Sequence, residues 1–576
     1  MISDKKDKTL EDFFEELLNG SWALIQFSLF PVKVHSKIGG FFENFIRSSL
    51  FYGLILGCFF LYCFSHNKHF SPLNYLWFFF PACFLFLLRH WLLLNSLKKQ
   101  GLIKKPIKTE NLKQSKKLNF KDFPTLLEDK DKAPIGLSLI SKKPVFLDVK
   151  DRCQHTIVSG ATGQGKTTLL KTLLSHSLKH GHPIIIIDPK GEKDDILEMK
   201  KKARFYNREK DFCLFSLSFP SQSFSYNPLL NGKSEQIKAR LMDGLQFTEE
   251  YYKAQASLFL GGILSSLKFL NKPISFSLLD KYLNDSSALT ELKNEISAKE
   301  SDTKSINEKW INRSLDSFSN SKNSKMTEMI DELALILDQI SAIPKKDLAG
   351  LQAQISSINC LEFRNILSPI NFHSDHFFSF SDILRHKKLA YFQLNVNGFG
   401  EISRQIGKMI LQDLKVLSNQ IQAGQQRFSY DFCSCFIDEF GSFATKDFAD
   451  FLKMARSSRI GIHLFCQGLS DLSSITPDFK NQIVGNTINK IVFRQDVSSD
   501  AEEWAKMAGT FSSKKKTYQI MGSESEEEMT GLGSLRNIKE MKIEFDIFKN
   551  LSKGEAVLID KADHKEDLLQ VWRPIL

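Results

Sequence analysis

The stretch GATGQGKTT, residues 160–168, decides the fold of this 576-residue chain. It fits the pattern G-x-x-x-x-G-K-[ST] without departure. The segment TIVS before it is typical of a strand, and the leucines after it recur at helical spacing. A strand, a glycine loop and a helix in this order predict a loop whose backbone N–H groups surround phosphate oxygens at a helix N-terminus.

Each residue type in this loop has a physical role. Lys166 is expected to reach the β and γ phosphates of a nucleotide, and the Thr167 hydroxyl is expected to bind Mg²⁺. The alternative is a chance glycine loop, which the flanking strand and helix disfavour. The predicted nucleotide-binding residues are Gly160, Ala161, Thr162, Gly163, Gln164, Gly165, Lys166, Thr167 and Thr168.

Two later strands are predicted to end in carboxylates. Four isoleucines, residues 184–187, precede Asp188 and are typical of a parallel strand buried on both faces. A second apolar run is followed by Asp438 and Glu439. We expect Asp438 to hold Mg²⁺ through water and Glu439 to activate the attacking water. Asp188 competes for the metal role, but only Asp438 is followed by a second carboxylate, so Asp188 is expected to cap its own turn.

A polar residue and several arginines complete the predicted catalytic set. Gln467 ends the predicted strand IGIHLFCQ, where it is placed to sense the γ-phosphate. Arg456, Arg459 and Arg494 are candidates to reach the nucleotide of a neighbouring subunit, although each alone is also typical of a surface salt bridge. The predicted catalytic residues are Lys166, Glu439, Gln467, Arg459 and Arg494, and the predicted metal ligands are Thr167 and Asp438.

Two apolar segments near the start of the chain indicate a membrane hairpin. Residues 48–65 carry no charge, residues 74–88 are similar and run on to 94, and both approach the ~20 residues that a spanning helix needs. Eight lysines follow between residues 98 and 117, against one lysine in the short loop between the segments, so the positive-inside rule places both termini in the cytoplasm. The alternative is a buried hairpin of a soluble core.

Composition adds only weak limits. The net charge of +11 permits a nucleic acid or an anionic membrane surface as partner and proves neither. The nine cysteines form no C-x-x-C pair and no zinc-ligand spacing, so we predict a reducing compartment and no metal other than Mg²⁺. Two basic stretches with aromatic residues, 201–210 and 512–519, are candidates for a nucleic-acid pore loop, although we expect each to be a solvated surface turn more readily than a pore loop.

The set of motifs resembles a known family. The hairpin, GATGQGKTT, IIIIDPKGE, SYNPLL (225–230), FIDEFGSF (436–443), the arginine-containing helix before IGIHLFCQ, and LSKGEAVLID (551–560) occur in the order of the TraD-type coupling proteins of type IV secretion and conjugation systems. These belong to the FtsK/HerA division of RecA-like ATPases. The resemblance covers about residues 45 to 575, and its combination of motifs is more specific than the nucleotide motifs alone.

The resemblance implies a function, a fold and partners. Such a protein is an inner-membrane, hexameric ATP hydrolase that uses ATP and Mg²⁺, recruits relaxase-bound single-stranded DNA to the secretion channel and drives its transfer. The implied fold is an α/β, RecA-like P-loop core with an inserted all-α domain. The expected domains are 1–47 cytoplasmic segment, 48–94 hairpin, 95–119 basic linker, 120–233 first half of the core, 234–372 helical insertion and 373–576 second half of the core.

Three alternatives stay open at this point. A coupling ATPase for protein effectors would have the same core and would differ in its helical insertion. An FtsK-like translocase of double-stranded DNA would usually carry more membrane segments and a winged-helix tail, and neither is visible. A membrane scaffold with a degenerate nucleotide site is disfavoured by the intact Lys166, Thr167, Asp438 and Glu439.

Overall fold

The computed structural model describes residues 123–311, 318–369, 374–521, 528–563 and 565–573. All of them belong to the second of the two units into which the chain divides, Ser115–Leu576. The predicted membrane hairpin, the segment before it and the basic linker lie outside the described residues. Within the described part of the chain, no helix is both long enough and apolar enough to span a bilayer.

An eleven-stranded sheet forms the centre of the described residues, in the order β2-β1-β13-β12-β9-β3-β8-β7-β4-β6-β5. The seven strands from β9 to β5 are parallel, as the α/β prediction requires. They are β9 (Asn489–Val492), β3 (Thr156–Ser159), β8 (Ile460–Cys466), β7 (Cys433–Ile437), β4 (Ile184–Asp188), β6 (Leu389–Gln393) and β5 (Phe212–Ser216).

Four antiparallel strands extend this sheet at one edge. They are β12 (Glu555–Asp560), β13 (Lys565–Val571), β1 (Lys132–Ser138) and β2 (Pro144–Asp148). The sheet therefore joins the first and the last described segments of the chain. A separate two-stranded sheet holds β10 (Thr510–Met521) and β11 (Glu528–Met541), so the basic stretch at 512–519 is a strand and the expectation of a surface turn was wrong.

The parallel strands are buried on both faces, which is why they read as continuous apolar runs. Every residue of β4 is buried, including its four isoleucines. Helix α7 (Lys166–Lys179) contacts β1, β4 and β7 and buries Leu169, Leu170, Leu173 and Leu174. Because the leucines of α7 recur at helical spacing, they all reach the same core.

The remaining helices of the core precede, connect or follow these strands along the chain. On the core they are α5 (Phe123–Leu126), α6 (Val149–Arg152), α8 (Lys193–Phe205), α16 (Phe380–Arg385), α17 (Val396–Gln422), α18 (Phe448–Ala455), α19 (Leu469–Ser473), α20 (Pro477–Asn486), α21 (Ser498–Ala508) and α22 (Phe545–Asn550). Short 3₁₀ turns η2 (Glu209–Asp211), η3 (Pro220–Gln222), η5 (Phe440–Ser442) and η6 (Arg456–Ser458) connect them.

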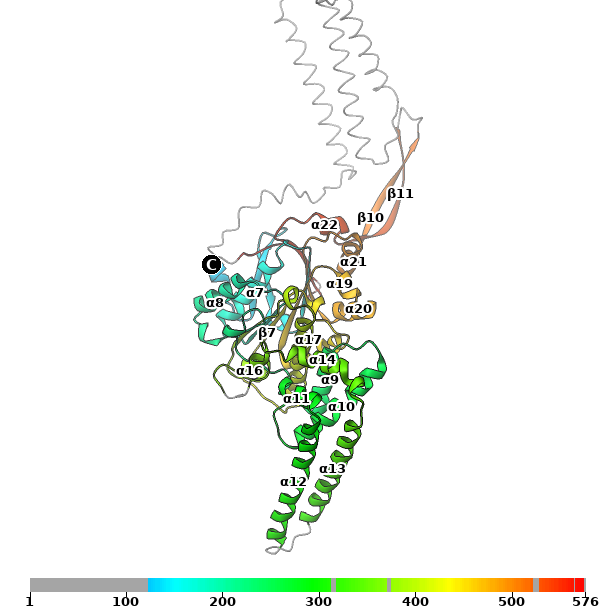
Figure 1. Ribbon diagram of the computed structural model, residues 1–576. Helices are drawn as coiled ribbons and strands as arrows, with labels where there is room; N and C mark the ends of the chain where they lie inside the picture. The colour runs from blue at the N-terminus through cyan, green and yellow to red at the C-terminus, as the bar shows by residue number, and fades with distance from the viewer. Residues whose placement is uncertain (1–122, 312–317, 370–373, 522–527, 564, 574–576) are drawn as a thin grey trace, which may run out of the picture. The chain divides into compact units, whose positions relative to one another are not determined.

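The segment predicted to be an all-α insertion contains helices and no strand among its described residues. It contains α9 (Ser234–Gly244), α10 (Glu250–Phe269), α11 (Phe276–Asn284), α12 (Ser286–Ile311), α13 (Phe318–Ser341), η4 (Lys345–Leu348), α14 (Ala349–Ile358) and α15 (Arg364–Leu367). Helices α12 and α13 pack side by side (Figure 1). The bounds 234–372 of an independent domain stay a prediction.

A buried polar group ties these helices to the core. The Tyr226 hydroxyl donates to Asp413 Oδ2 on α17 at 2.7 Å. Arg240 on α9 lies 3.0 Å from Asp413 Oδ1, an ion pair without hydrogen-bond geometry, and donates to the Pro228 carbonyl. Both charged side chains are at most 1% exposed. Tyr226 belongs to the SYNPLL motif, whose role here is to hold α9 against α17.

A second buried charge has only neutral partners among the described residues. Arg152 is fully buried, and its guanidinium contacts His463 Nε2 at 3.3 Å and donates to the hydroxyls of Ser434 and Ser177 at 3.1 and 3.3 Å. It also lies 4.6 Å from the centre of the Phe432 ring. Burial, reinforced by this positive charge, lowers the pKa of His176 to about 2 and of His182 to about 3.

These histidines make stability depend on pH. In the unfolded chain their pKa is about 6.5, so below that pH the unfolded state binds more protons than the folded state. The contribution of these two histidines to the free energy of unfolding is therefore present above pH 6.5 and is lost as pH falls. The loss is about 2 kcal/mol per histidine between pH 6.5 and 5. We expect the urea midpoint of the purified full-length chain to fall steeply between pH 7 and pH 5.

Two substitutions locate the origin of this effect. His182→Phe, next to Phe432, is expected to flatten the pH dependence, because it removes one of the buried imidazoles. His376→Gln, at an exposed histidine, is expected to leave the dependence as in the parent chain. Equal slopes in the parent chain and in His182→Phe would show that this imidazole does not titrate on unfolding.

Candidate active site

The loop between β3 and α7 has the backbone that its glycines predict. Gly163 has φ +77° and Gly165 has φ +123°, in the region that favours glycine. A Cβ on Gly160 would lie 2.5 Å from Cβ of Phe493, so glycine is required there by close packing. Thr162, Gly163 and Thr167 are exposed to solvent, which leaves the loop and the first turn of α7 open to a phosphate ligand.

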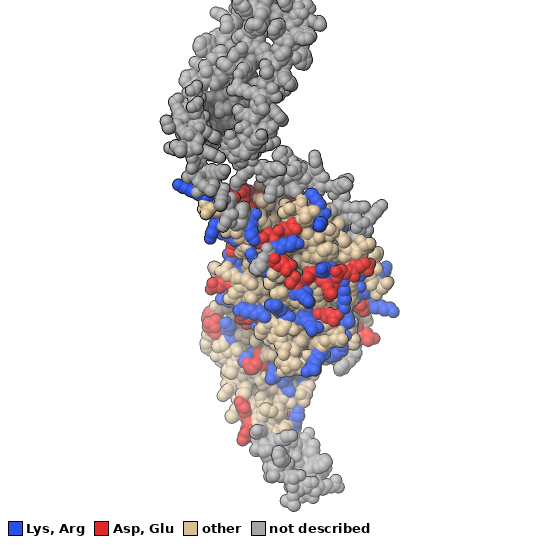
Figure 2. All heavy atoms as spheres, turned by 180° about the vertical axis from the view of Figure 1, so that it is seen from behind, with Lys and Arg blue, Asp and Glu red and all other residues tan. Residues whose placement is uncertain are grey.

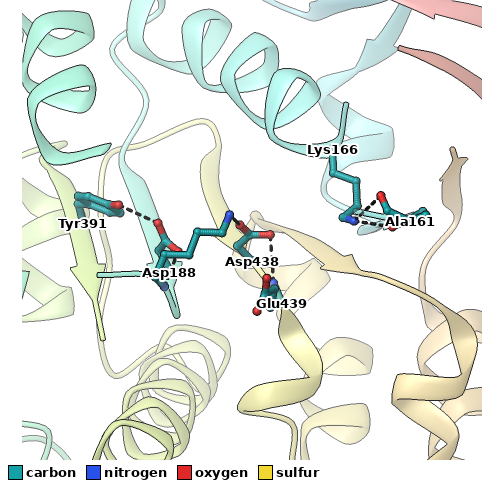
Figure 3. Close-up of polar contacts among 8 residues, drawn as sticks. Ala161, Lys166, Asp188, Tyr391, Asp438 and Glu439 are labelled. Carbon is teal, nitrogen blue, oxygen red and sulfur yellow. Dashed lines mark hydrogen bonds and ion pairs between the residues drawn. The ribbon is translucent and has the colours of Figure 1, made fainter. Parts of the chain in front are cut away.

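Lys166, the first residue of α7, curls back over this loop. Its ammonium group donates to the carbonyl oxygens of Gly160 and, at 3.1 Å, of Ala161 (Figure 3). Burial lowers the pKa of Lys166, and the negative charge of Asp438 opposes that shift. The cation of the motif therefore lies against two carbonyl oxygens of its own loop.

Asp438 and Glu439 lie at the carboxyl end of β7, which is separated from β3 by β8 alone. Asp438 is buried, and its Oδ1 accepts the Glu439 N–H at 3.1 Å (Figure 3). Glu439 has φ +41° and ψ +52°, which is strained for a residue with a side chain. Such strain persists where the surrounding structure imposes it, and here it sets the direction of a half-buried carboxylate beside the phosphate loop.

Asp188 takes the capping role that was expected for it. Its Oδ1 accepts the Lys190 N–H at 2.9 Å, and its Oδ2 accepts the Tyr391 hydroxyl at 2.7 Å (Figure 3). Burial raises the pKa of Asp188 to about 6. Both carboxylate oxygens are therefore already engaged in fixing the turn after β4.

The other predicted catalytic residues are spread over two edges of the sheet. Gln467 follows the last residue of β8, at the edge that carries the phosphate loop, and its side chain is exposed. The Arg494 carbonyl accepts the Ala161 N–H at 2.9 Å, while its guanidinium pairs with Asp496 at 3.0 Å. Arg459 precedes the first residue of β8 and so lies at the opposite edge, together with Arg456.

This placement limits what the arginines do. A strand of seven residues is about 23 Å long, so Arg459 does not reach its own phosphate loop. Arg494 is next to its own loop through its main chain, with its side chain held by Asp496. Within one chain, the structure brings together Lys166, Asp438, Glu439 and Gln467, and it leaves Arg459 apart.

Sequence reasoning missed two features of the site. Lys190 Nζ lies 2.8 Å from Asp438 Oδ2, and its only sequence signal is a lysine two residues after a strand-ending aspartate. The Gly554 N–H donates to the Gln164 carbonyl at 2.8 Å, and the Gly554 Cα would lie 3.4 Å from a Cβ on Gly165. The turn in LSKGEAVLID therefore supports the phosphate loop, although it is nearly 400 residues away in the sequence.

Two family models match the chain on either side of this site. The model of the HerA helicase central domain matches residues 133–363, which include the phosphate loop. The model of the TraM recognition site of TraD and TraG matches residues 433–542, which include Asp438, Glu439 and Gln467. Over these residues the chain is similar to HerA-type and to TraD- and TraG-type proteins. This agrees with the resemblance seen in the sequence motifs.

A solved structure of a conjugative coupling protein has a fold similar to that of this chain. The bacterial conjugative coupling protein TrwBdeltaN70, in an unbound form, is 14% identical, with a TM-score of 0.51 over 79% of this chain and 92% of that one. At this identity the likeness shows the mixed α/β, RecA-like core alone. TrwB in complex with ADP and Mg²⁺ is 12% identical, with a TM-score of 0.49 over 79% and 92% of the two chains.

A search of curated proteins finds a shorter likeness. A stretch of 65 residues, 11% of this chain, is 29% identical to an uncharacterized protein of Mycoplasma pneumoniae. The chain spans about half the length of that relative, 54%.

Proposed function

We propose that this protein is a coupling ATPase of a type IV secretion or conjugation system, which binds ATP with Mg²⁺ and uses its hydrolysis to drive relaxase-bound single-stranded DNA into the secretion channel. The observation that carries the proposal is the meeting of Lys166, Asp438 and Glu439 at one edge of a parallel sheet. The chain matches models of HerA and of TraD and TraG around these same residues.

The residues of the site fit ATP and Mg²⁺. The exposed loop N–H groups and Lys166 offer donors and charge to phosphates. Thr167 and Asp438 offer hydroxyl and carboxylate oxygens, the ligands that Mg²⁺ prefers, and the bound ion would neutralise phosphate charge. Glu439 accepts a proton from the attacking water, and Gln467 responds to loss of the γ-phosphate.

The distribution of charge bears on the partners. Residues 1–122 hold 17 Lys and Arg against nine Asp and Glu, a net +8 of the total +11. On the face drawn in Figure 2, basic and acidic side chains are interspersed over the described residues. We therefore propose that the excess positive charge of residues 1–122 binds an anionic membrane surface beside the hairpin 48–94. DNA binding is then assigned to local basic groups.

Assembly is part of the same proposal. A homohexamer in the inner membrane, with both termini in the cytoplasm, would place the exposed Arg459 or Arg494 of one subunit toward the nucleotide of the next. Arg459 lies at the edge of its own sheet that is opposite the phosphate loop. This placement supports either contact with the nucleotide of a neighbouring subunit or no contact with a nucleotide at all. The partners are the relaxosome and the secretion-channel components, and the matched description of a TraM recognition site supports an accessory protein at residues 433–542.

The ATPase of the purified full-length chain is expected to rise at least about tenfold with single-stranded DNA, because a motor that translocates DNA completes its cycle on that substrate. The measurement compares single-stranded DNA, double-stranded DNA and RNA at equal salt. Lys166→Ala, which removes the phosphate-binding cation, should show no ATPase under any of these conditions.

The other outcomes separate the alternatives. A response to double-stranded DNA alone would favour an FtsK-like translocase. An ATPase indifferent to every nucleic acid would contradict DNA transfer and favour export of protein effectors. A wild-type chain that does not hydrolyse ATP at all would refute the proposed motor and leave only a scaffold.

A further inference from the structure

A second cation of the site, Lys190, contacts the predicted metal ligand. Its Nζ lies 2.8 Å from Oδ2 of Asp438, and the side chains are 35% and 9% exposed. This lysine belongs to none of the catalytic, metal-binding or nucleotide-binding residues predicted from the sequence. An ion pair this close to a nearly buried carboxylate occupies one of the two oxygens that a divalent cation would use.

The position of Lys190 is built into the fold. Asp188 Oδ1 holds its backbone N–H at 2.9 Å. The loop after β6 clamps the same turn through three backbone hydrogen bonds, from Leu394 N to Asp188 O, from Asn395 N to Lys190 O and from Val396 N to Pro189 O, at 2.9, 3.3 and 2.7 Å. A surface lysine placed by chance would not have its main chain fixed on both sides.

The glycine that follows Lys190 makes the clamp possible. A Cβ on Gly191 would lie 2.4 Å from Cγ of Asn395, so any side chain at position 191 would displace the Asn395 side chain. Asn395 itself has a left-handed backbone with φ +49°, and its side chain donates to the Ser218 hydroxyl at 2.9 Å. The turn, the clamp and the ion pair thus form one rigid unit at the edge of the site.

The surrounding charges keep Lys190 protonated. Burial pushes the pKa of its ammonium group down, but the negative charges of Asp438, Asp188 and Glu439 outweigh burial and raise that pKa above its usual range. Lys190 in turn is one of the charges that act on Lys166, so the charges of Lys166, Lys190 and Asp438 influence one another. A phosphate and a divalent cation that enter together would offer each of these groups a new partner.

We propose that Lys190 is a positioning residue that competes with the divalent cation for Asp438 Oδ2, so that the metal binds well only when nucleotide phosphates offer the ammonium group another anion. This inference rests on the proposed nucleotide site and deepens it. Lys190 suppresses binding of a bare cation and couples metal entry to nucleotide entry.

The test measures Mn²⁺ binding without nucleotide, by the loss of the electron paramagnetic resonance signal of free Mn²⁺, in the purified full-length chain. Lys190→Met is expected to bind Mn²⁺ at least about tenfold more tightly than wild type, because one competing charge-assisted hydrogen bond is gone. Lys190→Arg keeps the charge and is expected to bind as wild type. Lys193→Met, at an exposed lysine three residues on, makes the same change in net charge and is the matched control.

A further variant locates the ion, and thermal melting of every variant verifies folding. Lys190→Met combined with Asp438→Asn should lose the gained affinity, which assigns the Mn²⁺ to this carboxylate. Lys190→Gln replaces Lys190→Met if the latter does not fold. Equal Mn²⁺ affinity in Lys190→Met and Lys193→Met, or equal gains in Lys190→Met and Lys190→Arg, would overturn the inference. Nucleotide binding by the wild-type chain tests the proposed site separately, so failure of one is distinguishable from failure of the other.

Discussion

Glu439→Gln is expected to lower the rate of ATP hydrolysis by about 10²–10⁴-fold while nucleotide affinity stays within a few-fold of wild type. The amide keeps the size of the side chain and removes its ability to accept a proton from water. The strained backbone of Glu439, with φ +41°, fixes where that carboxylate points, so a nearby acid does not replace it. Single-turnover hydrolysis and binding of a fluorescent nucleotide measure the two quantities.

A matched variant separates the carboxylate from its surroundings. Glu401→Gln, at a half-buried glutamate of α17 that accepts from Gln246, is expected to leave the rate unchanged. If Glu439→Gln hydrolysed ATP as fast as Glu401→Gln, Glu439 would not be the general base, and another carboxylate would have to serve.

Asp413→Ala is expected to destabilise the protein by about 3–5 kcal/mol, because it leaves the fully buried Arg240 without its counter-charge. It also removes the acceptor of the Tyr226 hydroxyl. Since this group joins α9 to α17, the helical segment and the core are expected to lose stability together. Urea unfolding of the full-length chain, followed by circular dichroism, gives the change.

An exposed ion pair provides the control for Asp413. Lys293 and Asp338 join α12 to α13 at 2.6 Å, with side chains 40% and 59% exposed, so Asp338→Ala should cost less than about 1 kcal/mol. Arg240→Met with Asp413→Leu removes both buried charges and is expected to restore most of the stability. A cost for Asp413→Ala no larger than for Asp338→Ala would contradict the account of the buried group.

The sequence predicts those parts of the fold that depend on short patterns. The isoleucines of β4 and the apolar run before Asp438 mark strands buried on both faces, because parallel strands need no polar alternation. The glycine motif predicts the turn before α7, because the backbone angles at Gly163 and Gly165 leave little other choice. These patterns also locate Lys166, Asp438 and Glu439 at one edge, since parallel strands share their carboxyl ends.

Other parts depend on contacts between distant segments. The pairing of β12 with β9 and the support of the phosphate loop by Gly554 join segments that are not neighbours in the sequence, and no local pattern predicts either contact. Strand β9 ends at Val492, and the next residue, Phe493, packs closely against Gly160. Strand β10 has a polar sequence without alternating apolar residues, so the sequence predicts a surface turn there instead of a strand.

The ion pair of Lys190 with Asp438 has the same origin. The lysine follows β4 and the aspartate follows β7, and only the parallel pairing of these two strands brings them within 2.8 Å. A sequence pattern identifies which strand ends carry charged residues. Which of these residues form ion pairs depends on the order of the strands in the sheet.

The central claim is that Lys166 and Asp438 serve a single site for ATP and Mg²⁺. The most direct measurement is the affinity of the purified full-length chain for a fluorescent ATP analogue, with and without Mg²⁺. The account predicts tighter binding with Mg²⁺ in wild type, at least about tenfold weaker binding in Lys166→Ala, and an affinity in Asp438→Asn that no longer responds to Mg²⁺. Wild-type affinity and an unchanged Mg²⁺ response in both variants would contradict it.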